Sequence, residues 1–233
     1  MEKGCRIVEI PARPNAAAID LRRTALVVID MQNDFLHPDG WFPASGADPA
    51  PLLPVIPVIA DLSSQMRAAG ARVIWLNWGV SPGAPELPAR IKAKAGQLGR
   101  RPVYGDPHPR GRGHVLGEGD WGAQIIANLS PAKEDLFVTK RRLSGFHDST
   151  FDSVLRNHGV ETLLFAGVNT DRCVYATLCD AAARGYECLL VKDACATGSP
   201  ASVRDSILFL VELLHGVCTT SSGVTQALST NVS

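Results

Sequence analysis

The chain has 233 residues, 45% of them hydrophobic and 20% charged, which is typical of one globular domain with a sizeable core. Lys plus Arg and Asp plus Glu both number 23, so the formal net charge of zero argues against a protein that binds nucleic acid or an acidic membrane. No run is apolar and long enough to span a membrane, and the N-terminal segment lacks the apolar core of a secretory signal, so we expect a cytoplasmic protein whose six cysteines are reduced thiols.

Short apolar runs alternate with helix-like segments along the chain. In chain order, the pattern predicts a strand at 24–30, a helix at 51–70, a strand at 71–77, a short helix at 121–129, a strand at 135–139, a helix at 149–158, a strand at 162–166, a helix at 173–184, a strand at 187–192, a helix at 201–214 and an edge strand at 216–220. Such alternation is typical of a mostly parallel sheet covered on both faces. We therefore predict an α/β fold, a three-layer αβα sandwich, in a single domain spanning 1–233.

Residues 78–121 interrupt this alternation. The segment is rich in Gly, Pro and Arg and has little periodicity, so it should form a long loop excursion over the surface. His108 and His114 should face solvent or a subunit contact there. Residues 1–20 precede the first strand as an N-terminal extension. Four arginines of the excursion either attract an anionic substrate or belong to a solvated basic loop: Arg100, Arg101, Arg110 and Arg112.

Polar or reactive residues follow four of the predicted strands. Asp30, Asn77, Lys140 and Cys173 all lie at or just beyond the carboxyl end of a strand. In a parallel sheet the active site lies at this edge. We therefore expect these four residues, far apart in sequence, to lie close together in space.

Cys173 is the candidate nucleophile because it lies where a predicted strand passes into a predicted helix. The free N–H groups and the dipole at a helix N-terminus favour a thiolate and can hold an oxyanion. Asp30 can act as the base, and Lys140 as the cation that stabilises both the carboxylate and the thiolate. Each residue has an ordinary alternative: Asp30 as a cap or turn residue, Lys140 as a solvated side chain, and Cys173 as a small buried hydrophobe. Only their combination favours the catalytic interpretation.

Three motifs carry a family resemblance. They are residues 25–35 (ALVVIDMQNDF), Lys140 with residues 144–146 (SGF), and residues 167–174 (GVNTDRCV). In this order they resemble the isochorismatase-like cysteine hydrolases, and the resemblance covers nearly the whole chain from about residue 20. The pairing of a strand-end acid with this cysteine segment makes the resemblance specific.

The resemblance implies that Asp30, Lys140 and Cys173 form a catalytic triad. It also implies a cis peptide bond between Val168 and Asn169, which turns the N–H groups of Asn169 and Cys173 toward one oxyanion. True isochorismatases, which cleave vinyl ethers, generally lack the cysteine. Its presence here therefore favours hydrolysis of a C–N bond through a thioester.

A closer likeness is to enzymes that hydrolyse ureides. Biuret and triuret hydrolases resemble the chain at 87–89, 105–107, 117–121 and 184–190. Ureidoacrylate amidohydrolase resembles it at 144–146, 151–153 and 155–156. The likeness implies a small ureide as substrate and ammonia as a product. The candidate substrate-binding residues are Phe35, Asn77, Gln124, Phe146 and His215, the last standing where biuret hydrolases carry a glutamine.

The resemblance also bears on cofactors and assembly. Residues 77–82 lack the histidine of the nicotinamidase metal site, so we expect neither a metal nor another cofactor. Family members are commonly tetramers, so a homotetramer is expected, with the excursion at 78–121 at a subunit interface. Two alternatives stay open: an amidase of another small amide, such as an N-carbamoyl amino acid or a nicotinamide-like compound, and a non-catalytic thiol or binding protein on the same fold.

Overall fold

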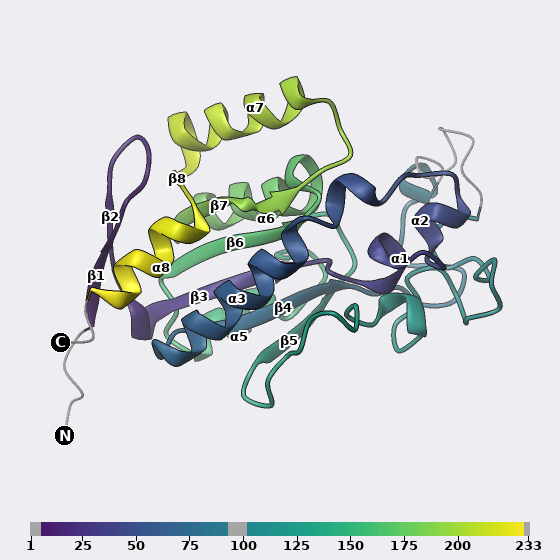
Figure 1. Cartoon of the computed structure of the whole chain (residues 1–233). Coiled ribbons are helices and arrows are strands. Elements are labelled where there is room, and N and C mark those ends of the chain that lie inside the picture. Colours follow the sequence, from purple (N-terminus) through teal and green to yellow (C-terminus); the bar gives the residue numbers. More distant parts are fainter. Residues whose placement is uncertain (1–5, 93–101, 231–233) are drawn as a thin grey trace.

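The computed structural model describes residues 6–92 and 102–230 (Figure 1). Six parallel strands form the central sheet in the order β5-β4-β3-β6-β7-β8. Their bounds are β3 (Thr24–Ile29), β4 (Arg72–Trp78), β5 (Leu136–Lys140), β6 (Thr162–Val168), β7 (Glu187–Ala196) and β8 (Val217–Thr219). The predicted α/β fold with a mostly parallel sheet is confirmed.

Helices flank both faces of the sheet. In Figure 1, α3 and α8 lie in front of it, α5 and α6 lie behind it, and α7 lies beyond β7 and β8. The helices are α1 (Asn33–Leu36), α2 (Trp41–Ala44), α3 (Val55–Ala68), α5 (Phe151–Asn157), α6 (Tyr175–Ala183), α7 (Ala201–Leu210) and α8 (Ser221–Ser229). Among the residues with assigned structure, no helix is long and apolar enough to cross a membrane.

The central strands are buried along their whole length. Every residue of β3 (TALVVI) and of β6 (TLLFAGV) is buried, as expected for strands covered on both faces. The helix α3 buries one stripe, formed by Val55, Ile59, Leu62 and Met66, at the spacing of a helix that packs on a sheet. Strands that are apolar along their whole length, and helices that are apolar on one face only, together account for the layered fold.

Three predicted helices differ in the structure. The expected helix at 121–129 is instead a single 3₁₀ turn, η3 (Trp121–Ala123). The rest of this segment forms backbone hydrogen bonds to residues before and within α1, because Asn33 N–H donates to Gln124 O at 2.9 Å and Ile126 N–H donates to Met31 O at 3.0 Å. The other two helices each contain a π-helical turn. These turns are η4 (Thr170–Val174) before α6 and η5 (Val211–His215) after α7.

The N-terminal extension has a structure of its own. It forms an antiparallel pair, β1 (Ile7–Ile10) with β2 (Ala17–Asp20), followed by a 3₁₀ turn, η1 (Leu21–Arg23). Reciprocal backbone bonds between Arg13 and Cys218, at 2.9 and 2.8 Å, join it to the sheet beside β8. A second 3₁₀ turn, η2 (Ala50–Leu52), precedes α3. The sequence patterns did not predict this pair or the C-terminal helix α8.

Gly167 allows the two central strands to approach closely. Its φ is +121°, and a Cβ at this position would lie 2.1 Å from the carbonyl oxygen of Ile29 on β3. No larger residue fits without moving backbone. The glycine therefore fixes the spacing of β3 and β6 just before the chain leaves each strand.

Candidate active site

The carboxyl ends of β3 and β6 mark the topological switch point of the sheet. From β3 the chain passes through β4 to β5 on one side, whereas β6, β7 and β8 follow on the other. The crevice at such a point is the usual ligand site of an open α/β sheet. Asp30 follows β3 directly, Asn169 follows β6, and Cys173 lies in the π turn η4.

Asp30 and Lys140 form a buried ion pair. Their Oδ2 and Nζ atoms are 3.0 Å apart, and the two side chains are 1% and 0% exposed. Lys140 ends β5, two strands away from β3, and reaches Asp30 across the end of β4. Its Nζ lies 4.1 Å from the centre of the Trp78 ring and donates to the carbonyl of Arg142 at 3.2 Å. The ammonium is thus satisfied by one carboxylate, one carbonyl and one aromatic face.

Burial controls proton affinity in this site. It raises the pKa of Asp30, and the Lys140 ammonium opposes that rise. Burial and the Asp30 carboxylate also raise the pKa of Cys173, against the opposing effect of Lys140. Desolvation of the thiolate is the largest of these effects, and it acts against the lowering of the cysteine pKa that a helix N-terminus favours. Burial thus makes the Cys173 thiol a weaker acid and the Asp30 carboxylate a stronger proton acceptor.

Backbone geometry and one threonine shape the cysteine turn. The peptide bond between Val168 and Asn169 is cis, and Asp30 has a φ of +54°. Thr177 is fully buried; its hydroxyl donates to the Cys173 carbonyl at 2.6 Å and accepts from Gly145 N–H at 3.1 Å. This hydroxyl connects the cysteine turn to the loop that follows Lys140.

A pocket of about 800 Å³ opens above Asp30 and Cys173. Its lining combines the reactive residues with aromatic, aliphatic and charged side chains: Asp30, Phe35, Trp41, Phe42, Trp78, Ile91, Tyr104, Arg142, Leu143, Ser144, His147, Asp148, Asn169, Arg172, Cys173 and Ala176. Two of the three catalytic candidates, Asp30 and Cys173, thus line one cavity, and Lys140 is joined to them through its ion pair with Asp30.

Comparison with known proteins identifies the family. The isochorismatase domain matches residues 24–222. The chain belongs to the isochorismatase family. The ureidoacrylate amidohydrolase RutB of Methylorubrum extorquens is 33% identical over 96% of this chain and 90% of its own, and that of Pseudomonas syringae pv. syringae is 35% identical over 94% and 91%.

Solved structures share this fold. A cysteine hydrolase from Pseudomonas syringae pv. phaseolicola superposes with a TM-score of 0.75, at 25% identity, over 99% of this chain and 100% of that one. The N-carbamoylsarcosine amidase of Thermoplasma acidophilum gives a TM-score of 0.64 at 27% identity, over 85% and 96%. The α/β architecture described above is therefore that of the isochorismatase family.

Only one of the five predicted substrate-binding residues lines the pocket. Phe35 lines the pocket, but Asn77, Gln124, Phe146 and His215 do not. Neighbouring residues of a strand face opposite sides, so Asn77 points away from the face on which Trp78 meets the pocket. Gln124 is exposed.

Phe146 and His215 each contact other groups. The Phe146 ring packs edge-on against Phe151, with 4.9 Å between ring centres. His215 lies 3.4 Å from the Tyr175 hydroxyl, in a separate hollow beside residues 186–188. Neither side chain lines the pocket, because Phe146 is buried in its aromatic contact and His215 lies in the other hollow.

Several pocket residues carried no signal of their own in the sequence. Trp41 and Phe42 belong to the four-residue helix α2, and Tyr104 to the long excursion. Trp78 ends β4 and also lines the pocket. Arg172 precedes Cys173 directly, so its place in the chain alone indicated proximity to the nucleophile.

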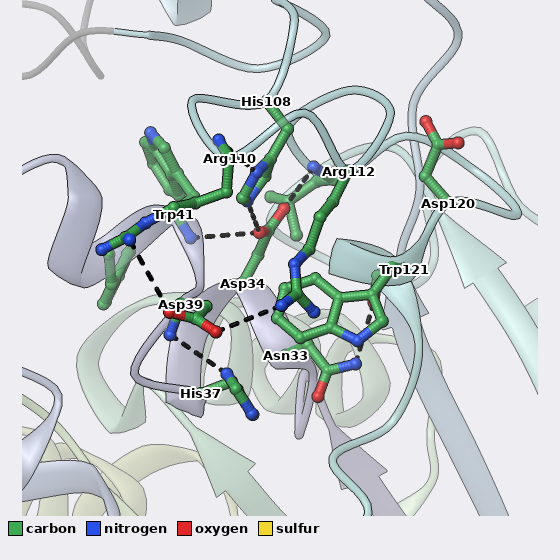
Figure 2. A network of polar contacts seen from close by, with 12 residues as sticks. Asn33, Asp34, His37, Asp39, Trp41, His108, Arg110, Arg112, Asp120 and Trp121 are labelled. Carbon is green, nitrogen blue, oxygen red and sulfur yellow. Dashed lines mark hydrogen bonds and ion pairs between the residues drawn. The ribbon is translucent and has the colours of Figure 1, made fainter.

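Asp34 anchors the excursion to the pocket wall (Figure 2). Its Oδ1 accepts from Trp41 N–H at 3.1 Å and lies 3.0 Å from His108 Nε2, while its Oδ2 accepts from Leu116 N–H at 2.6 Å. Nδ1 of His108 accepts from Arg110 N–H at 3.1 Å, so Nε2 carries the ring proton and donates to Asp34. The expectation that His108 faces solvent or a subunit contact is wrong, because its side chain is fully buried against this carboxylate within the chain.

Two of the four candidate arginines of the excursion, Arg110 and Arg112, bind one protein carboxylate. Arg112 pairs with Asp39 at 3.1 Å and lies over the Trp121 ring at 4.1 Å, while Arg110 lies 3.9 Å from Asp39 (Figure 2). Neither lines the pocket. Arg100 and Arg101 fall outside the described residues. Within the part of the chain that is described, no three His, Cys, Asp or Glu side chains group as a metal site requires.

Replacing His108 by alanine is expected to lower the free energy of unfolding by about 3 kcal/mol, because it leaves a buried carboxylate without one donor. Urea denaturation followed by circular dichroism measures this loss. His114→Ala is the matched control: His114 also faces a carboxylate, Asp120, at 3.2 Å, but is one-third exposed, so its loss should stay below about 1 kcal/mol. Equal losses in the two variants would contradict the anchoring role of His108.

Proposed function

We propose that this isochorismatase-family protein is a cofactor-free cysteine amidohydrolase that cleaves a C–N bond of a small ureide. The observation that carries the proposal is that Asp30, held in an ion pair with Lys140, lies together with Cys173 at one pocket. Asp30 and Lys140 are paired at 3.0 Å, and Asp30 and Cys173 both line the cavity. A base, a cation and a nucleophile in one buried crevice are the parts that covalent amide hydrolysis requires.

The first half-reaction forms a thioester. Asp30 takes the proton of the Cys173 thiol as the sulfur attacks the substrate carbonyl carbon. The backbone N–H groups of Asn169 and Cys173 hold the resulting oxyanion. As the tetrahedral intermediate collapses, the C–N bond breaks, and Asp30 returns the proton to the leaving ammonia or amine. The raised pKa of Asp30 suits it to both directions of this transfer.

The second half-reaction regenerates the enzyme. Asp30 deprotonates a water molecule, which attacks the thioester carbonyl and forms a second oxyanion at the same N–H groups. The carbon–sulfur bond then breaks, and the thiolate recovers its proton from Asp30. The Lys140 ammonium stabilises whichever of Asp30 and Cys173 is anionic.

The names of the relatives support a ureide or carbamoyl substrate. The RutB proteins are called ureidoacrylate amidohydrolases, and a structural neighbour is called an N-carbamoylsarcosine amidase. Both names describe a carbamoyl nitrogen compound. Biuret and triuret share this group and remain in the proposed set. Phe35 is the predicted binding residue that the pocket supports.

Ammonia release from a panel tests the proposal. The panel holds ureidoacrylate, N-carbamoylglycine, N-carbamoylsarcosine, biuret, triuret and nicotinamide, each assayed with the purified full chain. We expect turnover of at least one carbamoyl compound and none of nicotinamide. A folded protein that releases no ammonia from any of them would reject the ureide assignment and favour a non-catalytic binding protein.

The expected homotetramer also stays a proposal. Helix α7 and the turn that follows it expose Phe209, Leu213 and Leu214, which are each about 60% accessible. An exposed group of large apolar side chains is typical of a subunit contact. The proposed assembly would cover this surface.

A further inference from the structure

The pocket wall is more apolar than a ureide alone requires. Five aromatic residues surround the cavity: Phe35, Trp41, Phe42, Trp78 and Tyr104. A cavity of about 800 Å³ is in the range that accepts organic ligands well beyond the size of urea or biuret. The wall therefore fits a substrate with a carbon segment attached to its carbamoyl group.

Most charges that line the pocket are already paired inside the protein. Asp30 is paired with Lys140. Arg142 donates to the carbonyl oxygens of Arg141 and Glu86 and forms an ion pair with Asp148 at 2.6 Å. Its guanidinium is thus engaged on several sides, and the Asp148 carboxylate is neutralised by it.

Arg172 is different. It precedes the nucleophile, lines the same pocket, and its side chain is 43% exposed. The ion pair recorded for it among the described residues is a loose one, 3.8 Å from Nε to the neighbouring Asp171. That carboxylate accepts hydrogen bonds from the hydroxyls of Thr197 and Ser199. Asp171 is therefore held by other donors, and the guanidinium fork of Arg172 is available to a ligand.

We propose that the substrate is a ureide that carries a carboxylate, and that Arg172 binds this carboxylate while Cys173 attacks the carbamoyl carbon. The proposal rests on the amidohydrolase function given above and narrows it. A planar guanidinium matches a carboxylate with two parallel hydrogen bonds, which a neutral ureide cannot accept with the same strength. Arg172 is thus a specificity-determining residue, and acidic ureides are the preferred class over biuret and triuret.

Matched substrates test the proposal. N-carbamoylglycine and N-carbamoylglycinamide have nearly the same shape but end in a carboxylate and a neutral carboxamide, so the ratio of their kcat/KM values, followed as loss of the carbamoyl group, reports recognition of the charge. We expect the wild-type protein to prefer the acid by about 10- to 100-fold, the range of a charge-assisted contact. Arg172→Gln should remove this preference by raising KM for the acid, with kcat and the amide kinetics nearly unchanged, and Arg172→Lys should restore part of it. Arg204→Gln, at an exposed arginine of α7, is the control and should retain the preference.

The outcomes separate this inference from the function beneath it. Equal turnover of the acid, the amide and biuret by the wild-type protein would overturn the role of Arg172 and leave the amidohydrolase intact. An equal loss on acid and amide in Arg172→Gln would also overturn it, because a purely structural defect affects both. Ammonia from none of the three, and none from the wider panel, would instead reject the amidohydrolase itself.

Discussion

Replacing Cys173 by alanine is expected to abolish ammonia release, with a loss of more than about 10³-fold in kcat/KM, because the substrate carbonyl then has no nucleophile to attack. Cys173→Ser should be nearly as inactive, since Asp30 is suited to a thiol proton and not to the far less acidic hydroxyl. Mass spectrometry after rapid acid quenching should find an acyl adduct on the wild-type chain and none on Cys173→Ala.

Cys188→Ala is the matched control for this experiment. Cys188 is also buried, at 4% exposure against 6% for Cys173, but it lies at the amino end of β7, away from the pocket. The control should keep wild-type turnover and the adduct. Activity retained by Cys173→Ala would refute the covalent mechanism, whatever the control shows.

Breaking the Asp30–Lys140 pair is expected to cost both activity and stability. Asp30→Asn and Lys140→Met each leave one fully buried group without its counter-charge, and such losses amount to about 3–5 kcal/mol of unfolding free energy. Asparagine tolerates the positive φ of residue 30, so the first substitution adds little backbone strain. Each variant should also lose about 10²- to 10⁴-fold in kcat, the usual contribution of a general acid–base group.

The double variant Asp30→Asn/Lys140→Met separates these two effects. With neither charge present, most of the lost stability should return, because replacing a whole buried ion pair is often nearly neutral. Activity should not return, since the base is absent. Urea denaturation and ammonia release on the same four proteins form a double-mutant cycle. Additive stability losses in the double variant would show that the two groups do not act as a buried pair.

The sequence was most informative where local pattern and structure depend on the same physics. Continuous apolar runs predicted the strands β3 and β6, because strands covered on both faces need no polar side. Asp30 and Cys173 were predicted to lie together because the carboxyl ends of parallel strands share one edge. These expectations required only the order of elements and the chemistry of the residues at their ends.

The sequence was least informative where a contact depends on distant backbone. Residues 121–129 look helical, yet their N–H and C=O groups bond to residues near α1, and no local pattern records that. His108 looks like a polar loop residue, but the fold places it against Asp34 and buries both. Asn77, Gln124, Phe146 and His215 have suitable chemistry for a ureide and lie outside the pocket.

The sequence by itself determined the layered α/β fold and the choice of candidate reactive groups, since periodicity and residue chemistry are local properties. Only the tertiary structure decided the properties of those groups. Burial and the neighbouring Asp30 carboxylate raise the pKa of Cys173 although this residue lies in a helical turn. The Lys140 side chain extends over the Trp78 ring, and its ammonium forms an ion pair with Asp30. Which side chains line the pocket is likewise fixed by packing among distant segments, because proximity and desolvation arise only when the chain is folded.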